Sequence, residues 1–253
     1  MVKVNLYGID GAKKETVKLP SSFETPIRPD IIQKSFNVIS SNKRQLYGPH
    51  YRAGAQHATA SVGKGQGRSR VPRLTQGRQA ALAPCVVGGR RAHPPNLNRN
   101  WHEKMNKKEK RMARFSALAA TTNKDLVSKR GHRFDENITL PLIVDDEFDK
   151  LNKTKDVIKA LKDLGVYDDI IRAKNGKHIR AGKGKSRGRR YRTPKSILII
   201  SSNPSLIKGS KNLTGIDIAH PREVNIEHLA PGGTSGRLTI ITKSSLSALG
   251  GDA

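Results

Sequence analysis

Two long stretches of the sequence contain no acidic residue, and this feature constrains the fold more than any other. Residues 31–102 carry 12 Lys or Arg, and residues 172–195 carry 11. These stretches account for +23 of the formal net charge of +27, so the other 157 residues are nearly neutral. We therefore expect a globular domain of ordinary composition that presents two basic segments to a polyanionic partner.

The first acid-free stretch does not have the pattern of a segment that folds alone. Residues 48–89 contain eight glycines, their aromatic residues end at Tyr51, and their apolar positions follow neither the period of a strand nor that of a helix. The contacts within such a segment do not compensate for the conformational entropy that is lost when it becomes ordered. We predict that residues 45–99 form an extended loop ordered by a partner, with a reach on the order of 80 Å.

The rest of the chain alternates between strand and helix patterns. Apolar runs or alternation predict strands at residues 2–7, 140–144, 196–200 and 238–242, with a weaker signal at 215–219. Helical spacing predicts helices at residues 29–39, 103–126, 154–164 and 167–173. This order predicts one α/β domain from residues 1–44 and 100–253, with a mainly parallel central sheet flanked by helices. To this Rossmann-like layering the chain adds a long irregular basic loop at 45–99 and a second basic loop at 172–195.

The glycine patterns do not fit a nucleotide site. Residues 63–67 read G-x-G-x-G, without the dinucleotide spacing and without a strand before them or a helix after them. Residues 176–184 resemble a P-loop only loosely, because one residue too many precedes Gly182 and because Gly184 stands where Ser or Thr would hold magnesium. We predict no cofactor, with magnesium only as a counter-ion of the nucleic acid.

Patterns typical of catalysis or of metal binding are also missing. The eight histidines form no H-E-x-x-H pattern, and the single cysteine, Cys85, excludes an internal disulfide and a Cys-rich metal site. Asp145, Asp146 and Glu147 follow a predicted strand, but no base or further ligand accompanies them. We interpret them as a solvated strand end and predict neither catalytic residues nor metal ligands.

The basic segments have the composition of phosphate-binding surfaces. Glycine alternates with cations in residues 63–73 and 181–192, so guanidinium groups and backbone N–H groups can both approach phosphates. Aromatic residues on which single-stranded bases would stack are few: Tyr47, Tyr51 and Tyr191. This favours recognition of the backbone and shape of a large folded RNA. Solvated linkers and a membrane surface remain the alternatives.

The chain has no sign of a membrane or secretory segment. No stretch approaches the roughly 20 apolar residues of a membrane span, and the first ten residues lack the pattern of a signal peptide. We expect a cytoplasmic protein without membrane insertion.

Four segments carry a resemblance to a known family. They read GKGQGRSRVPR at residues 63–73, GGRRAHPP at 88–95, IRAGKGKSRGRR at 179–190 and HLAPGG at 228–233. With them, essentially the whole chain resembles the archaeal-type branch of the L-four family of large-subunit ribosomal proteins. The resemblance implies a non-enzymatic constituent of the large ribosomal subunit, whose α/β core lies on the outside of the subunit and whose long loop threads into the rRNA.

The same resemblance implies roles for particular residues. The family binds several rRNA domains early in assembly, and its loop tip helps form the polypeptide exit tunnel, opposite a loop of the L-twenty-two protein and beside the nascent polypeptide. The tip is expected at Gly65, Gln66, Gly67, Arg68, Ser69, Arg70 and Val71. The cations expected to bind rRNA are Arg44, Arg52, Lys64, Arg68, Arg70, Arg73, Arg78, Arg90, Arg91, Arg99, Arg180, Lys183, Lys185, Arg187, Arg189, Arg190 and Arg192.

Two other functions remain open from the residues alone. An architectural protein outside the ribosome would share the charge but would bind duplex DNA as well as folded rRNA. An RNA-modifying enzyme with an α/β core would bind a nucleotide or methyl-donor cofactor, for which the sequence offers no loop.

Overall fold

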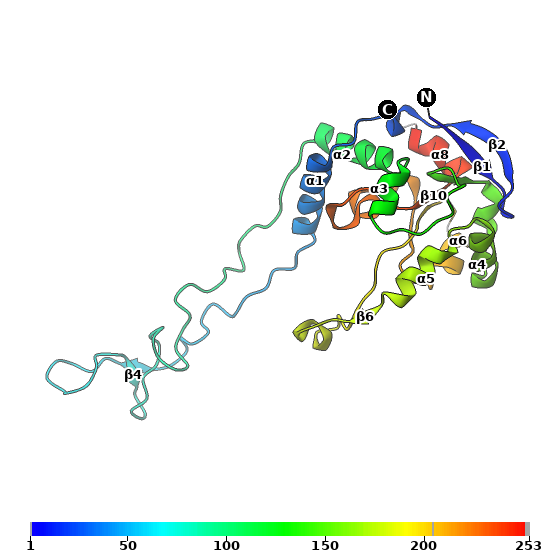
Figure 1. Ribbon diagram of the computed structural model, residues 1–253. Coiled ribbons are helices and arrows are strands. Elements are labelled where there is room, and N and C mark those ends of the chain that lie inside the picture. Colours follow the sequence, from blue (N-terminus) through cyan, green and yellow to red (C-terminus); the bar gives the residue numbers. More distant parts are fainter. Residues whose placement is uncertain (1, 204, 251–253) are drawn as a thin grey trace. The chain divides into compact units, whose positions relative to one another are not determined.

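The chain forms two compact units. The structure is a computed structural model and describes residues 2–203 and 205–250. The core unit is drawn from Met1–Ser40 and Glu103–Ala253, and the loop unit is Ser41–His102. In Figure 1 the loop unit is the light-blue to green segment that includes β4.

A six-stranded sheet forms the centre of the core unit (Figure 1). Its strand order is β2-β1-β5-β10-β8-β9, and every neighbouring pair is parallel except β1 with β2. The predicted α/β fold with a mainly parallel sheet is therefore confirmed. The strands are β1 Lys3–Tyr7, β2 Lys13–Lys18, β5 Leu142–Val144, β8 Leu198–Ile200, β9 Asp217–Ala219 and β10 Thr239–Thr242.

Strand β2 was not predicted from the sequence, because its residues KKETVK carry no hydrophobic pattern. Five of its six side chains are exposed, and Val17 is half-buried. The strand is held by its backbone pairing with β1, in a register that runs from Lys3 opposite Lys18 to Tyr7 opposite Lys13. Its lysines lie on an outer strand, where charge prevents further strands from pairing.

Helices cover both faces of the sheet, and each face buries its own hydrophobic cluster. The α-helices are α1 Pro29–Asn42, α2 Lys107–Ala120, α3 Lys124–Lys129, α4 Thr154–Asp163, α5 Tyr167–Asn175, α6 Ser205–Ser210, α7 Ile226–Leu229 and α8 Lys243–Gly250. Side chains of α1, α2, α7 and α8 pack with Ile143 of β5. Side chains of α3, α4, α5 and α6 pack with Leu142 and Val144. The strand predicted at residues 140–144 is thus buried on both faces.

The helix predicted at residues 103–126 is wrong in its extent. The structure has two helices instead, α2 and α3, separated by residues 121–123. The hydroxyls of Thr121 and Thr122 donate to the carbonyls of Leu118 and Ala119, at 2.7 and 2.8 Å. The Asn123 side chain then accepts from the backbone N–H of Asp125 and caps α3. Short polar side chains that bond to the local backbone end a helix even where Gly and Pro are absent.

Candidate nucleic-acid interface

The loop unit contains little regular structure. Two short strands, β3 (Thr59–Ala60) and β4 (Arg73–Leu74), pair antiparallel and enclose residues 61–72. Of the ten cations predicted here to bind rRNA, all are exposed except Arg73, which is half-buried. Tyr47, Tyr51 and Val87 are also 87%, 77% and 90% exposed. Exposed apolar and aromatic groups beside cations are typical of a surface that contacts a partner.

The predicted tip, residues 65–71, lies at the end of this hairpin. Gly65 and Gly67 have φ values of +75° and +61°, a region that residues with a side chain rarely adopt. A Cβ atom at either glycine would meet no other atom of the chain. Residues 65–70 are exposed, and Val71 is half-buried. Glycine is thus required at these two positions by the backbone path and not by packing within the chain.

Arg73 has a structural contact that the sequence did not predict. One terminal nitrogen of its guanidinium donates to the carbonyl of Arg78 at 2.8 Å, and the other donates to the Ser69 hydroxyl at 3.2 Å. These bonds join the loop that precedes β4 to the turn that follows it. Arg73 therefore differs from its exposed neighbours, because its side chain shapes the loop.

Trp101 organises the neck of the loop unit, where the outgoing and returning chains meet. The guanidinium carbon of Arg44 lies 4.0 Å from the centroid of the Trp101 ring, and that of Arg99 lies 4.2 Å from it. The Ser41 hydroxyl donates to the Trp101 carbonyl at 2.6 Å. Cation–π contacts of this kind hold guanidinium groups in place while leaving their N–H groups available to phosphates.

The second basic segment is a hairpin of the core unit. Strands β6 (His178–Ile179) and β7 (Tyr191–Arg192) pair antiparallel, and a short 3₁₀ helix, η3 (Lys183–Ser186), lies between them. All seven predicted rRNA-binding cations of this segment are exposed. The Lys177 ammonium lies 4.6 Å from the centroid of the Tyr191 ring, which is 48% exposed.

The base of this hairpin is anchored by the fully buried carboxylate of Asp169. It accepts hydrogen bonds from the Ser196 hydroxyl at 2.7 Å and from the Arg172 Nε at 2.8 Å, and it lies 3.0 Å from the His132 Nδ1. Arg172 also donates to the Lys195 carbonyl at 2.8 Å and so joins the two ends of the hairpin. Arg172 and Lys195 lie in the acid-free stretch, yet their side chains form ion pairs with carboxylates outside it, Arg172 with Asp169 and Lys195 with Asp217.

The ionised carboxylate of Asp169 is stabilised by its hydrogen-bond partners. Burial raises the pKa of Asp169, but the hydrogen bonds from His132, Arg172 and Ser196 outweigh burial and hold that pKa below its ordinary range. Burial lowers the pKa of His132, although the contact with Asp169 acts in the opposite direction. Asp169 is therefore ionised, and His132 is neutral with a proton on Nδ1.

Arg237 forms a second buried network beside the first. Its side chain is fully buried and donates to the carbonyls of Ser196 and His228, at 2.8 and 2.7 Å. Its guanidinium also lies 2.7 Å from the Asp217 carboxylate, which pairs on its outer side with Lys195 at 2.9 Å. Arg237 thus joins the starts of β8 and β10 to the segment 228–233, which contributes to the resemblance.

Seventeen cations are therefore presented without neutralisation inside the chain. Among the residues that the structure describes, none of the predicted rRNA-binding cations forms an ion pair with a carboxylate. The absence of acids from each segment explains this directly. Positive charge that finds no internal partner attracts a polyanion.

The acidic cluster after β5 has structural partners. Asp145 pairs with Lys14 at 2.5 Å and accepts from the Asp146 backbone N–H, and Asp146 accepts from the Ser244 N–H at 2.8 Å. The Lys14 hydrogen bond is the main reason that the pKa of Asp145 is lowered. Within residues 2–203 and 205–250, no three His, Cys, Asp or Glu side chains gather as metal ligands. In the same part of the chain, no helix is long and apolar enough to span a membrane.

Comparisons with known proteins agree with the resemblance of the four segments. The family model "Ribosomal protein L4/L1 family" matches residues 17–252. The large ribosomal subunit protein uL4 of Thermoplasma acidophilum is 46% identical over 247 residues, which cover 98% of this chain and 97% of the relative. The uL4 protein of Methanococcoides burtonii is 46% identical over 252 residues, which cover 99% of each chain.

A third relative of the same kind, uL4 of Methanocaldococcus jannaschii, is 46% identical over 249 residues and covers 98% of both chains. These matches include both basic segments as well as the sheet, so the likeness is not limited to the α/β core. The chain belongs to the ribosomal protein L4/L1 family.

Proposed function

We propose that the chain is a structural constituent of the large ribosomal subunit that binds rRNA through the loop unit and the β6–β7 hairpin. The observation that carries this proposal is the set of seventeen cations, sixteen of them exposed, that have no carboxylate partner among the described residues. Their two segments differ in chain position but share the alternation of glycine with Lys or Arg, which suits close approach to phosphates. The names of the relatives supply the large subunit as the place of assembly.

The loop tip is the part of the protein that we assign to the polypeptide exit tunnel. Residues 65–70 are exposed glycines, polar residues and cations, and a Cβ atom at Gly65 or Gly67 would meet no other atom of the chain, which leaves room for partners. In this proposal the flanking cations bind rRNA early in assembly, and the tip lies beside the nascent polypeptide and a loop of the L-twenty-two protein. The protein acts in the cytoplasm without catalysis or cofactor, and magnesium enters only as a counter-ion of the rRNA.

Sedimentation tests the ribosomal part of this proposal. Cell lysate in magnesium buffer is separated on a sucrose gradient, and the protein is detected with an antibody. We expect nearly all of it in the large-subunit, ribosome and polysome fractions. A main pool that sediments apart from large subunits would contradict the proposal.

Salt dependence tests the mode of binding. With about ten phosphate contacts, the affinity of the full chain for large-subunit rRNA should fall by roughly five orders of magnitude between 50 and 200 mM monovalent salt, by analogy with duplex DNA. Duplex DNA of equal length is the competitor at each salt concentration. Equal affinity for the duplex would instead favour an architectural DNA-binding protein.

A further inference from the structure

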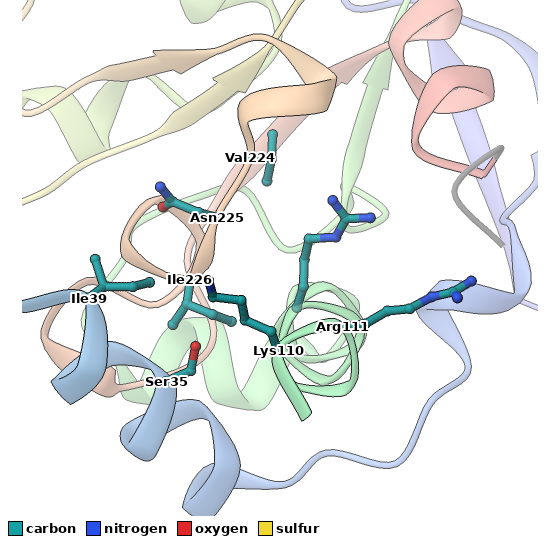
Figure 2. Close-up of a pocket in the computed structure, with 8 residues that line it drawn as sticks. Ser35, Ile39, Lys110, Arg111, Val224, Asn225 and Ile226 are labelled. Atoms are coloured by element: carbon teal, nitrogen blue, oxygen red, sulfur yellow. The ribbon is translucent and has the colours of Figure 1, made fainter. Parts of the chain in front are cut away.

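A pocket in the core unit is lined by no residue of the loop unit or of the β6–β7 hairpin. It has a volume of about 480 Å³ and lies between α1, α2 and the residues that lead into α7. Its lining residues are Ser35, Ile39, Lys110, Arg111, Arg114, Val224, Asn225 and Ile226. Figure 2 shows the Ser35 and Lys110 side chains pointing toward Ile226, whereas Arg111 extends to the other side of α2.

The pocket combines an apolar floor with polar groups. Ile39, Val224 and Ile226 supply the floor, and buried Val224 and Ile226 belong to the hydrophobic cluster on this face of the sheet. Ser35 is 1% exposed, and its hydroxyl has no hydrogen-bond partner among the described residues. The Asn225 carboxamide oxygen accepts from the His228 N–H and caps α7, so its NH₂ group supplies the donors on that side.

The cations of the pocket come from the first half of α2, where the guanidinium carbons of Arg111 and Arg114 also lie 5.3 and 5.7 Å from the centroid of the Phe115 ring. Residues 107–114 of α2 contain five Lys or Arg and one acid, Glu109, which pairs with Lys34 at 3.1 Å. Cations in the first turns of a helix repel its positive end, and an anion there is attracted by both. Lys110 and Arg114 are four residues apart and so lie on the same side of α2. No acidic residue lines the pocket within the described chain.

We propose that this pocket receives a single nucleotide that is turned out of the stacked rRNA. The apolar floor suits the face of a base, Ser35 and Asn225 suit the hydrogen-bonding edge of a base, and Lys110 with Arg114 suits the phosphates on either side. The volume lies within the range of about 300 to 1,000 Å³ that is typical of sites for small ligands. The positive charge at the pocket favours a nucleotide over an apolar side chain of a neighbouring protein.

This inference rests on the proposed binding of rRNA and adds a site that is lined by no residue of the loop unit or of the β6–β7 hairpin. The test uses the full chain and transcribed large-subunit rRNA at constant salt. Lys110→Glu should weaken binding by about tenfold. Lys155→Glu is the matched control, because Lys155 is an exposed residue in the first turn of α4 and lies outside the pocket, yet undergoes the same reversal of charge. The control should weaken binding by less than about threefold.

Ultraviolet cross-linking followed by mass spectrometry locates the nucleotide. We expect a one-nucleotide adduct on the peptide that contains residues 224–226, and we expect Ser35→Leu, which fills the pocket, to remove this adduct while adducts on the loop unit persist. Circular dichroism checks that each variant is folded. If Ser35→Leu does not fold, the rRNA affinities of Lys110→Glu and Lys155→Glu alone decide whether the pocket binds RNA.

The outcomes separate the site from the function on which it rests. If the wild-type chain binds rRNA but both charge reversals have equal effects, or if adducts occur only on the two basic segments, the pocket is not a nucleotide site and the proposed function stands. If the wild-type chain has no affinity for rRNA, both proposals are wrong. Cross-links from the pocket to a protein in isolated large subunits would also overturn the inference.

Discussion

The guanidinium of Arg44 lies over the ring of Trp101, 4.0 Å from its centroid, although 56 residues separate the two along the chain. Arg99, on the returning side of the loop unit, contacts the same ring at 4.2 Å. One aromatic residue therefore fixes the guanidinium groups of both sides of the neck. Each such contact at an exposed site is worth about 0.5–1 kcal/mol, enough to orient the two cations.

Because Trp101 is the only tryptophan, its fluorescence reports on the neck. Arg44→Ala should expose one face of the ring to water and shift the emission maximum to longer wavelength. Arg52→Ala is the control, because the guanidinium of Arg52 lies over Tyr51, at 5.4 Å from the ring centroid, and is not among the groups that contact Trp101. An emission maximum of Arg44→Ala that equals that of the wild type would show that the contact does not persist in solution.

Arg237→Met should lower the free energy of unfolding by about 3 kcal/mol, measured by urea denaturation. The substitution leaves the Ser196 and His228 carbonyls without a donor and removes the buried partner of Asp217. Lys195→Met removes the outer partner of the same carboxylate, whose side chain is 26% exposed, and should cost less than about 1 kcal/mol. An equal loss of unfolding free energy in the two variants would show that the burial of Arg237 does not increase its contribution to stability.

Stability should fall on acidification in two ranges. The pKa of His132 is lowered in the folded chain, so the unfolded chain takes up the proton first, and stability is lost as the pH falls below about 6.5. The pKa of Asp169 is also lowered, so its contribution is complete above about pH 4 and is lost below it. Each group contributes a slope of at most about 1.4 kcal/mol per pH unit.

Urea denaturation at pH 7.5, 6.0 and 5.0 separates the first range from the second. His132→Gln should flatten the dependence between pH 7.5 and 5.0, since a neutral carboxamide takes up no proton. His178→Gln changes an exposed histidine of the hairpin and should keep the wild-type dependence. Identical curves for His132→Gln and the wild type would contradict the assignment.

Deletion of residues 55–82 should leave the core unit folded. The backbone of Gly54 packs against Gly89 and Arg90, and Gly89 packs against Ala83, so a short Gly-Ser linker can join residues 54 and 83. We expect the melting temperature to change by less than about 4 °C, whereas incorporation into large subunits on a sucrose gradient should fall strongly. Unfolding of the shortened chain would show that the core depends on the loop.

Much of the core could be predicted because its strands carry unbroken apolar runs. Leu142, Ile143 and Val144 are all fully buried, as a strand between two helical layers must be. Strand β2 could not be predicted, since backbone pairing holds it in place without a hydrophobic pattern. The break after α2 could have been predicted from Thr-Thr-Asn, whose side chains compete for backbone groups.

The positive charge of the candidate interface could be predicted from the sequence, but the contacts of its side chains could not. Acid-free stretches identify the exposed cations, yet composition does not distinguish Arg73 and Arg172, which bind within the chain, from Arg68 and Arg187, which are exposed. Nor does it find the pocket, because its cations lie in residues 107–114, where Glu109 interrupts the run of cations, so this short stretch does not stand out as acid-free. Contacts over more than 60 residues, such as that of α2 with the Asn225 segment, depend on the fold alone.

The place of β10 in the sheet has a consequence for how the protein is made. This strand lies in the middle of the sheet, where it pairs with both β5 and β8. It is also the last strand in the sequence, so it is the last to leave the ribosome that synthesises the chain. Until residue 242 has emerged, β5 and β8 have no common neighbour, and the basic loop is already free. Such non-local pairing slows folding. Newly made chains therefore pass through a period in which the cationic loop is exposed before the core is complete.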